Sequence, residues 1–492
     1  MNKFTVLLLM LACSIAMNIY SQPVSLDSTF GHNGRIVIPN TSEISFFDFD
    51  TYSNIIAVGY TLKEGGKYDL TIVKTTADGV IDETFGNNGI AKVTDYDQIF
   101  PIGMKITKNN KIIVIGSFMK VQFQGYETII MRFNENGTVD KNFGNNGKVN
   151  LNFNAGNIVS LNFDNDDFML IAKMDFQNGN QNLYIEKYSY EGVIDNTFGE
   201  NGKTYLTNSI FPYRMKILNN GSIIVAGTYN TQPNTELGLC KLTSAGKLDM
   251  NFAINGIWHK NTMQDFDLDH ESFFDVLEDR DGNLILSGAG LADSLNWSNS
   301  TFLSKFSLNG ELDMNFGENG FYCFDSGSIS KPIFQIDDKY ITAVRYNNES
   351  HKIIYVNGNG SFGEYVYTCD IYYFQAMKLQ EGNKIILGGG HKDNTHGTNF
   401  VLERVIDSSK TSIKPETSIK LNNYSSDDLA IFPNPVKDNL YFSKETAFEI
   451  IDIQGQIMLK STTPVKSVNI SSFRTGVYFI RFENIVQKII KE

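Results

Sequence analysis

The sequence is poor in cysteine and proline. It contains four cysteines and 10 prolines. Cys13 lies in an apolar N-terminal segment, and Cys240, Cys323 and Cys369 are widely spaced, odd in number and without a Cys-x-x-Cys pair. A disulfide framework and a zinc knuckle are therefore not indicated, and small buried apolar side chains are the favoured interpretation. Few prolines, 41 glycines and 12% aromatic residues suit many short strands joined by tight turns.

Positive charge and linear catalytic motifs are also scarce. The formal net charge is -13, so the phosphates of a nucleic acid would meet repulsion, and we predict no nucleic-acid partner. The sequence shows no Gly-x-Ser-x-Gly nucleophile motif, no Walker loop and no dinucleotide-binding glycine pattern after a strand. We therefore expect no cofactor.

A membrane helix needs about 20 consecutive apolar residues, and the sequence shows no apolar run of that length. The run Phe4–Met17 is shorter, follows Lys3 and precedes the polar Ser21. These are the parts of a secretory signal peptide, which we expect over residues 1–21, with no transmembrane segment in the mature chain. Met10–Cys13 loosely resembles a lipobox, so a lipoprotein leader is the alternative.

A Phe-Gly motif recurs along the chain. The segment Leu26–Gly34 returns as Ile81–Gly89 and then four more times, and successive phenylalanines are separated by 55, 58, 55, 54 and 64 residues. Its glycines and the Asn between them supply the positive φ angles of a sharp reversal, and its Phe can fill the gap between repeats. We interpret the motif as structural. Its copies are Phe30-Gly31, Phe85-Gly86, Phe143-Gly144, Phe198-Gly199, Phe252-Ala253 and Phe316-Gly317.

A second marker, an apolar run that usually ends in Gly, has the same period. It occurs seven times, at Asn54–Gly59, Lys111–Gly116, Phe168–Ala172, Ile223–Gly227, Leu284–Gly288, Tyr340–Val344 and Lys384–Gly388. Strand-like stretches flank each run, so that one unit contains four short strands separated by turn signals. In the second unit these strands are Ile102–Ile106, Lys111–Phe118, Glu127–Phe133 and Lys148–Leu151.

The two ends of the repeat array complement each other. Arg35–Ile38 is a fourth-type strand with no first three strands before it, and Phe400–Val405 is a third-type strand with no fourth after it. The N-terminal strand is therefore expected to complete the last blade and remove the free edges. We predict an all-β fold, a seven-bladed β-propeller of four-stranded blades over residues 22–406, with a degenerate seventh repeat at Gly358–Gly363.

The repeat resembles a known family. The pattern Asp-Gly-x-Ile-Asp-x-x-Phe-Gly-x-x-Gly, as in Asp78–Gly89, is similar to the delta-60 repeat, and the resemblance covers roughly residues 26 to 406. That family is associated with β-propellers and with no single activity, so the resemblance implies a fold and leaves the mechanism open.

The C-terminal part follows a different pattern. Residues 407–428 are rich in Ser, Thr and Asp and indicate a linker. Residues 429–492 contain short alternating strands, which predict a small C-terminal β-sandwich.

This segment resembles the type A sorting domain of the type IX secretion system. The resemblance implies a partner, the type IX machinery, and export across the outer membrane of a Bacteroidetes-type bacterium, followed by release or surface attachment. An ordinary sandwich domain is the alternative. The residues that carry the resemblance are Pro433, Asn434, Pro435, Asp452, Gly455, Gly476 and Tyr478.

Two clusters are weighed as metal sites. His391 and His396 share a glycine-rich loop, but no carboxylate or Cys completes the set, so a polar turn is favoured over a metal site. Asp265, Asp267 and Asp269 alternate as calcium ligands can. An EF-hand would need Gly where His270 stands and an acid where Val276 stands, so a solvated acidic loop is favoured.

The leading functional hypothesis is a monomeric, non-catalytic binding protein that takes an extracellular glycan or protein. The alternatives are a propeller enzyme acting on glycans as hydrolase or lyase, with Asp48 and Asp275 near the channel, and a structural role in a surface or adhesion layer. Acidic, basic and His side chains that converge at the channel favour catalysis, whereas an aromatic face favours binding.

Overall fold

The computed structural model divides into two compact units, residues 1–416 and 417–492, which are described separately. The structure describes residues 24–491 except 121–124, 152–157, 165–167, 178–179, 207–209, 231–234, 262–268, 294–297, 325–327, 347–349, 370, 383, 393–397, 408–430, 433–435, 453–456, 475 and 483–484. The predicted signal peptide and nearly all of the predicted linker lie outside these residues. Within them the chain forms strands and turns only, and no helix is long and apolar enough to cross a membrane.

In its described part the first unit forms seven antiparallel sheets. Six contain four strands that follow one another in the sequence, and the seventh joins the last three strands to two N-terminal strands. The first strands are β3 (Glu43–Phe49), β7 (Gln98–Ile106), β11 (Ile158–Phe163), β15 (Ile210–Ile217), β19 (Asp269–Glu278), β23 (Ser328–Ile336) and β27 (Tyr373–Gln380). The second strands are β4 (Ile55–Lys63), β8 (Ile112–Lys120), β12 (Phe168–Gln177), β16 (Ile223–Asn230), β20 (Leu284–Asp293), β24 (Lys339–Tyr346) and β28 (Lys384–Lys392).

The outer strands complete these sheets. The third strands are β5 (Lys67–Thr75), β9 (Gly125–Phe133), β13 (Asn180–Ser189), β17 (Thr235–Leu242), β21 (Ser298–Phe306), β25 (Ser350–Asn357) and β29 (Thr398–Asp407). The fourth strands are β6 (Ile90–Val93), β10 (Lys148–Asn150), β14 (Lys203–Tyr205), β18 (Ile257–Lys260), β22 (Phe321–Phe324) and β26 (Phe362–Cys369). The four strands expected for the second unit coincide closely with β7 to β10.

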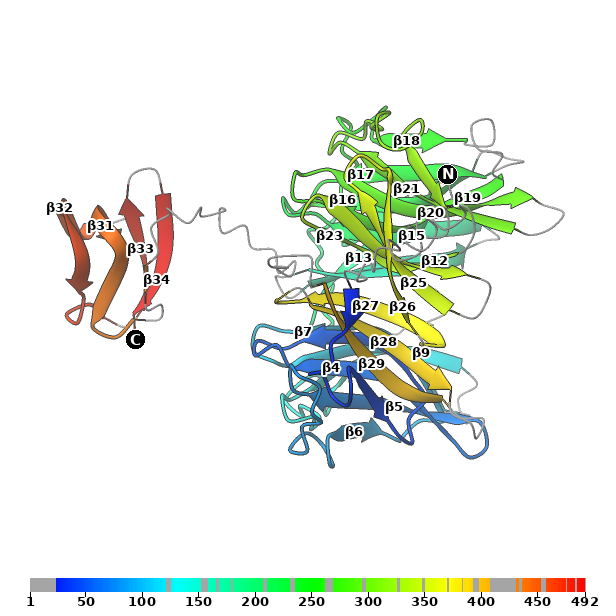
Figure 1. The fold of residues 1–492 in the computed structure, drawn as a ribbon, viewed down its shortest axis with the longest axis horizontal. Coiled ribbons are helices and arrows are strands. Elements are labelled where there is room, and N and C mark those ends of the chain that lie inside the picture. The colour runs from blue at the N-terminus through cyan, green and yellow to red at the C-terminus, as the bar shows by residue number, and fades with distance from the viewer. Residues whose placement is uncertain are drawn as a thin grey trace, which may run out of the picture. The chain divides into compact units, whose positions relative to one another are not determined.

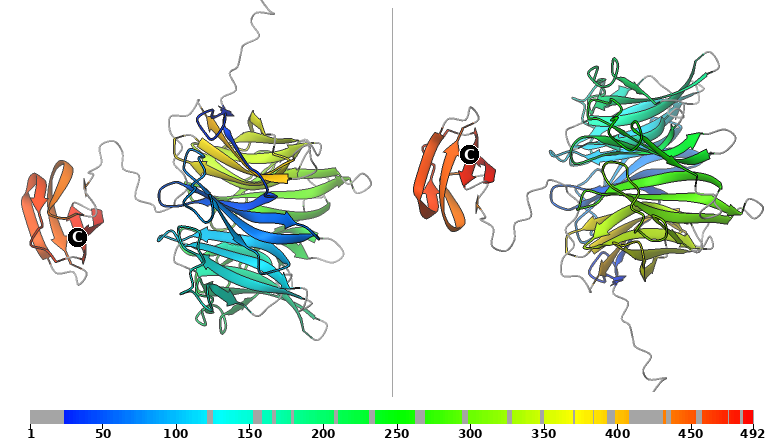
Figure 2. Two further views of the ribbon diagram at one scale, coloured as in Figure 1. Left: turned by 90° about the horizontal axis from the view of Figure 1, so that it is seen from below. Right: turned by 90° about the horizontal axis from the view of Figure 1, so that it is seen from above.

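The sheets are arranged in a ring. Each first strand contacts the first strand of the next sheet, and β27 in turn contacts β3. Figures 1 and 2 show the gold strands of the last sheet beside the blue strands of the first sheet. The all-β propeller fold is therefore confirmed. We call the end of the sheets where the first strands begin the start side, and the end where they finish the turn side.

Two N-terminal strands complete the last sheet. Both β1 (Val24–Leu26) and β2 (Arg35–Ile38) pair with β29, and the register sets Arg35 opposite Glu403. Two details differ from the sequence-based expectation. Asp407, assigned to the linker, is the fully buried last residue of β29 and accepts a hydrogen bond from Tyr355 Oη at 2.5 Å. Residues 358–363, expected as a degenerate seventh repeat, form the turn into β26 and the start of that strand in the sixth sheet, and the Asn359 carbonyl in this turn accepts the Gly317 N–H at 2.8 Å.

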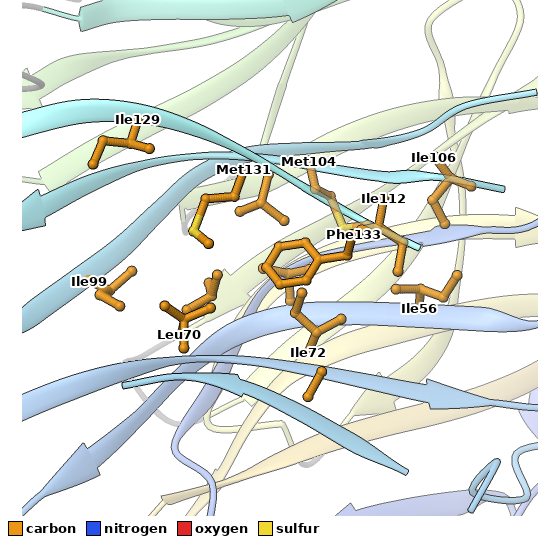
Figure 3. Close-up of a cluster of buried hydrophobic side chains, with 14 of the residues drawn as sticks. Ile56, Leu70, Ile72, Ile99, Met104, Ile106, Ile112, Ile129, Met131 and Phe133 are labelled. Carbon is orange, nitrogen blue, oxygen red and sulfur yellow. The ribbon is translucent and has the colours of Figure 1, made fainter. Parts of the chain in front are cut away.

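Each second strand is buried on both faces. Ile56 and Val58 of β4 belong to the apolar cluster shared with the second sheet, which Figure 3 shows around Phe133. Ile55 and Ala57 of the same strand belong to the cluster shared with the seventh sheet. Such strands show continuous apolar runs because both faces are covered. Burying one aliphatic side chain contributes about 1.5–3 kcal/mol, so the sheet interfaces dominate the stability.

The Phe-Gly motif joins each sheet to the next. Phe85 is fully buried, and its ring lies 2.8 Å from where a Cβ on Gly137, in a turn of the following sheet, would lie. The Gly86 N–H donates to the carbonyl of Asn136 in the same turn, at 2.8 Å. Gly31 repeats this bond to Asp78 at 2.8 Å, so the N-terminal segment joins the first sheet exactly as an ordinary repeat would.

Arg404 lies at the junction between the two ends of the propeller. Its side chain is fully buried, and Nε donates to Asp27 Oδ2 at 2.8 Å. Nη1 donates to the Ala77 carbonyl at 2.7 Å and to Asp78 Oδ1 at 3.0 Å. Nη2 donates to Thr29 Oγ1 at 3.0 Å. One side chain of the last sheet thus binds the N-terminal segment and the first sheet together.

The surroundings of Asp27 favour its charged carboxylate beside the Arg404 guanidinium. Burial raises the pKa of its carboxyl, but hydrogen bonds from Thr29 and the charge of Arg404 outweigh burial and hold the pKa below its ordinary value. The guanidinium also lies over the Phe30 ring, 4.8 Å from its centre, which adds a cation–π contact.

The second unit has its own core. In its described residues β30 (Ile431–Phe432), β31 (Asn439–Ile451), β33 (Gly476–Phe482) and β34 (Ile485–Lys491) form one sheet, and β32 (Ile457–Asn469) pairs with β31. Hydrogen bonds link all five strands through β31. Register shifts between Tyr441 and Thr446 interrupt the long strands, and buried residues such as Phe448 and Ile480 form the core.

We expect Arg404→Ala to lower the free energy of unfolding of the first unit by about 3–5 kcal/mol, because it leaves a buried carboxylate without its partner. Arg132→Ala is the matched control, since Arg132 pairs with Asp140 at 3.0 Å inside the array and is 19% exposed. Urea unfolding of both variants measures the difference. Equal losses would contradict a special role for the closing junction.

Stability should also depend on His351, which is 5% exposed and stacks on Phe374 with ring centres 5.1 Å apart. Burial and the charge of Arg345 lower the pKa of His351 to about 4, against a weaker opposing hydrogen bond at Ile371. The neutral ring is favoured in the folded state, so its contribution is complete above the unfolded pKa of about 6.5 and is lost as the pH falls towards 4. Unfolding of His351→Phe should be less pH-dependent over this window than that of the wild type, and identical profiles would refute this.

Ala253 replaces the motif glycine and holds a positive φ of 46°. A side chain in this region costs about 1–2 kcal/mol, so Ala253→Gly should raise the free energy of unfolding by about 1 kcal/mol. Gly199→Ala is the reverse change at φ 59° and should destabilise. Thermal unfolding compares the two, and a destabilised Ala253→Gly variant would show that the local strain is absent.

Candidate functional site

Charged side chains lie near the turn-side ends of the first strands. Asp48 on β3 accepts a bond from Lys378 Nζ on β27 at 2.6 Å, and Asp275 on β19 accepts one from Arg214 Nε on β15 at 2.8 Å. Each ion pair joins neighbouring sheets. The two carboxylates named from the sequence as catalytic candidates therefore belong to different sheets and are each bound to a base.

Lys105 on β7 occupies the same register position as Asp48. Both pair with the second residue of the next strand, Ile113 and Ile56 respectively. Burial lowers the pKa of Lys105, and the charges of Lys378 and Lys216 lower it further, while Asp48 and Asp164 oppose them. The layer thus carries mixed charge from several sheets.

Aromatic side chains gather at the start side of three consecutive sheets. Tyr60 and Tyr68 of the first sheet have ring centres 5.2 Å apart, and Phe100 of the second sheet lies 5.9 Å from Tyr60 and 5.2 Å from Tyr68. Tyr373 of the seventh sheet lies near Glu43, which binds Tyr60, because a Cβ on Gly390 would lie 3.1 Å from Glu43 Cβ and 3.3 Å from Tyr373 Cδ2. The ring centre of Tyr373 lies 4.7 Å from that of Tyr372. These five aromatic residues form what we call the aromatic strip.

The strip combines exposed rings with fixed ones. Tyr372 is 39% exposed and Tyr373 is 44% exposed, whereas Tyr60 is partly buried. Tyr60 Oη donates to Glu43 Oε1 at 2.5 Å, and burial together with this carboxylate raises the pKa of Tyr60. Lys392 lies over the Tyr372 ring at 5.3 Å. The strip therefore offers apolar ring faces bordered by polar groups.

The two clusters weighed as metal sites, for which the sequence favours a polar turn and an acidic loop, are only partly described. Asp265, Asp267 and His396 lie outside the described residues, Asp269 begins β19, and His391 lies in β28 opposite Asn399. Across the described residues, His, Cys, Asp and Glu form no group of three that suits a metal ion. Cys240 is buried, and burial raises the pKa of its thiol to about 12.

The residues that carry the sorting-domain resemblance are also only partly described. Pro433, Asn434, Pro435 and Gly455 lie outside the described residues, and Asp452 follows β31. Gly476 begins β33 opposite Lys491. Tyr478 is 7% exposed, and its hydroxyl donates to the Arg474 carbonyl at 2.9 Å. Its ring also lies 5.1 Å from that of Phe473, so Tyr478 is a packing residue of this unit.

Sequence reasoning missed Arg404 and the aromatic strip. A signal for Arg404 exists, because a basic residue recurs near the end of the third strand, at Lys74, Arg132, Lys187, Lys241, Lys305 and Arg404. The strip has no such linear signal. Four of its members lie on four strands of three sheets, including the first and the last in the chain, and Tyr372 directly precedes β27.

Family comparisons match both units. The profile described as a secretion system C-terminal sorting domain matches residues 430–492. The profile described as a β-propeller domain of unknown function, DUF5122, matches residues 54–85, 107–143 and 218–252, and the delta-60 repeat is of this type. No curated protein matches the chain.

Solved structures with similar folds are distant. The β-propeller domain of the Trilobed protease from Pyrococcus furiosus is 10% identical, with a TM-score of 0.41 over 75% of this chain and 95% of that one. A putative 6-phosphogluconolactonase from Bacteroides fragilis is 11% identical, with a TM-score of 0.36 over 75% and 98%. Puromycin hydrolase is 10% identical, with a TM-score of 0.44 over 85% of this chain and 58% of that one.

The sorting domain indicates a protein that is secreted or held at the outer cell surface. Both resemblances seen in the sequence are confirmed, and the chain carries β-propeller repeats of the DUF5122 or delta-60 type followed by a type IX secretion C-terminal sorting domain.

Proposed function

We propose that the exported propeller is a non-catalytic binding protein that takes an extracellular glycan on its aromatic strip. The observation that carries this proposal is the run of Tyr60, Tyr68, Phe100, Tyr372 and Tyr373 across three sheets. The C–H face of a sugar ring packs on an aromatic ring, and tyrosine hydroxyls and nearby charged groups bind its hydroxyls. Residues fixed by a rigid scaffold lose little entropy on binding.

The fixed members of the strip support this proposal. Tyr60 is held by Glu43, and Tyr126 Oη donates to Gln98 Oε1 at 2.5 Å at the same end of the second sheet. Gly389 allows a close approach, since a Cβ there would lie 1.9 Å from the Tyr373 carbonyl. The exposed tyrosines therefore stand on strands whose positions are set by packing.

The competing hypothesis of a glycan-cleaving enzyme needs two carboxylates across one bond, about 5–9.5 Å apart. Asp48 and Asp275 lie on the first and fifth sheets and each binds a basic residue of an adjacent sheet. This arrangement suits a role in holding the sheets together, and it favours binding over hydrolysis.

The purified full chain should bind at least one member of a polysaccharide panel without releasing products. Tyr372→Ala combined with Tyr373→Ala should weaken that binding about tenfold or more, as loss of central aromatic contacts does. Affinity electrophoresis measures binding, and a reducing-sugar assay with mass spectrometry measures release.

Tyr205→Ala is the matched control, because Tyr205 is 60% exposed on the outer strand β14 and lies outside the strip. It should bind as the wild type does. Turnover of any polysaccharide would overturn the non-catalytic assignment, and unchanged binding by the double variant would overturn the role of the strip.

A further inference from the structure

A polar cleft lies between the first and second sheets on the turn side, away from the aromatic strip. Its volume is about 500 Å³, within the range of ligand sites. Six of the residues that line it lie in β5, in the turn after β5 and in two turns of the second sheet. They are Lys74, Asp82, Asn109, Lys111, Asn134 and Glu135.

Charges within the cleft are balanced by close partners. Lys74 Nζ lies 3.2 Å from Asp50, 4.0 Å from Asp82 and 3.9 Å from Glu135. The Lys74 side chain is 6% exposed, so it is fixed at the base of the cleft. The residues that line the cleft include two lysines, Lys74 and Lys111, and two carboxylates, Asp82 and Glu135, so their formal charges cancel and neither a strongly anionic nor a strongly cationic ligand is favoured.

Lys111, the second lysine of the cleft, is also paired with neighbouring side chains. Lys111 Nζ lies 3.2 Å from Asp140 and donates to Asn134 Oδ1 at 2.6 Å. Asn109 is exposed and makes no side-chain hydrogen bond with the rest of the described chain. Glu135 has a side chain that is 49% exposed. An amide and a carboxylate therefore offer donors and acceptors to a ligand in the cleft.

The walls of the cleft are preorganised. The Asn110 N–H donates to the Thr107 carbonyl at 2.9 Å, and Asn110 has a positive φ of 56°. Its Oδ1 accepts the Thr51 N–H at 3.0 Å, and its Nδ2 lies 3.5 Å from Glu135 Oε1. One buried amide thus ties together the three turns around the cleft, so little ordering is needed when a ligand binds.

The corresponding junction between the second and third sheets is occupied differently. Arg132 holds the position of Lys74, since Ile113 pairs with Arg132 as Ile56 pairs with Lys74. The longer guanidinium bridges to Glu191 at 2.5 Å and lies over Phe143. The shorter lysine makes a longer contact across the first junction, with its Nζ 3.9 Å from Glu135, and it leaves room there.

We propose that the polar cleft is a second binding site, independent of the aromatic strip, that takes a neutral polyhydroxylated ligand of one or two sugar residues. Vicinal hydroxyls both donate and accept, which matches a lining of amides, carboxylates and ammonium groups whose charges already cancel. The volume accommodates a ligand of that size.

The test uses the full chain and calorimetric titration with cellobiose, maltose and N,N′-diacetylchitobiose as probes. At least one should bind with a Kd of about 10 mM or lower, and digalacturonate and the glucosamine dimer should bind about tenfold more weakly. Asn109→Ala combined with Glu135→Ala should weaken binding about tenfold. Both side chains are exposed, so the fold should be retained, and thermal unfolding checks this.

The matched control is Asn309→Ala with Glu311→Ala, which removes the same residue types from an exposed turn of the fifth sheet. That control and the Tyr372→Ala/Tyr373→Ala variant should bind the disaccharide normally, which separates this site from the strip. Hydrogen exchange should slow in residues 107–111 and 134–138 when the disaccharide is added. Absence of binding by all three neutral disaccharides, or undiminished binding by the cleft variant, would overturn the proposal.

Discussion

The architecture depends on the junction where the last sheet binds the first. A propeller with an open junction would expose strand edges and two apolar sheet faces. Arg404 prevents this by binding Asp27 and Thr29 of the N-terminal segment and the Asp78 turn of the first sheet. Because the guanidinium is fully buried, the contact forms only when all three segments are in place. Closure and the folding of the N-terminal strands are thereby coupled.

The same contact, in weaker form, recurs at other junctions. Arg132 pairs with Asp140 and lies over Phe143 as Arg404 pairs with Asp27 and lies over Phe30. Repetition gives a rigid ring, and the candidate binding sites lie at particular junctions between its sheets. The polar cleft accompanies a lysine at the position of Arg132, and the aromatic strip occupies strand ends that the repeat pattern leaves variable.

Export and binding are assigned to separate units. The sorting domain has its own core, and Tyr478, one of the residues that carry its resemblance, is buried within that core. The ring supplies a scaffold that needs no disulfide among its described cysteines, because the interfaces between sheets bury apolar side chains on both faces of each sheet. Such a scaffold suits a protein that is secreted or held at the outer cell surface.

The sequence by itself determined the all-β repeat architecture and the sorting domain, because both follow from local patterns of residues. Phe85-Gly86 and Ile55–Gly59 mark turns and buried strands through their own conformational preferences. Only the tertiary structure decided which residues that are distant in the sequence come into contact. Tyr373 is far from Glu43 and Tyr60 in the chain and close to them in space, and Asp48 binds Lys378 of the last sheet. The reason is that ring closure sets these distances, and no local propensity encodes it.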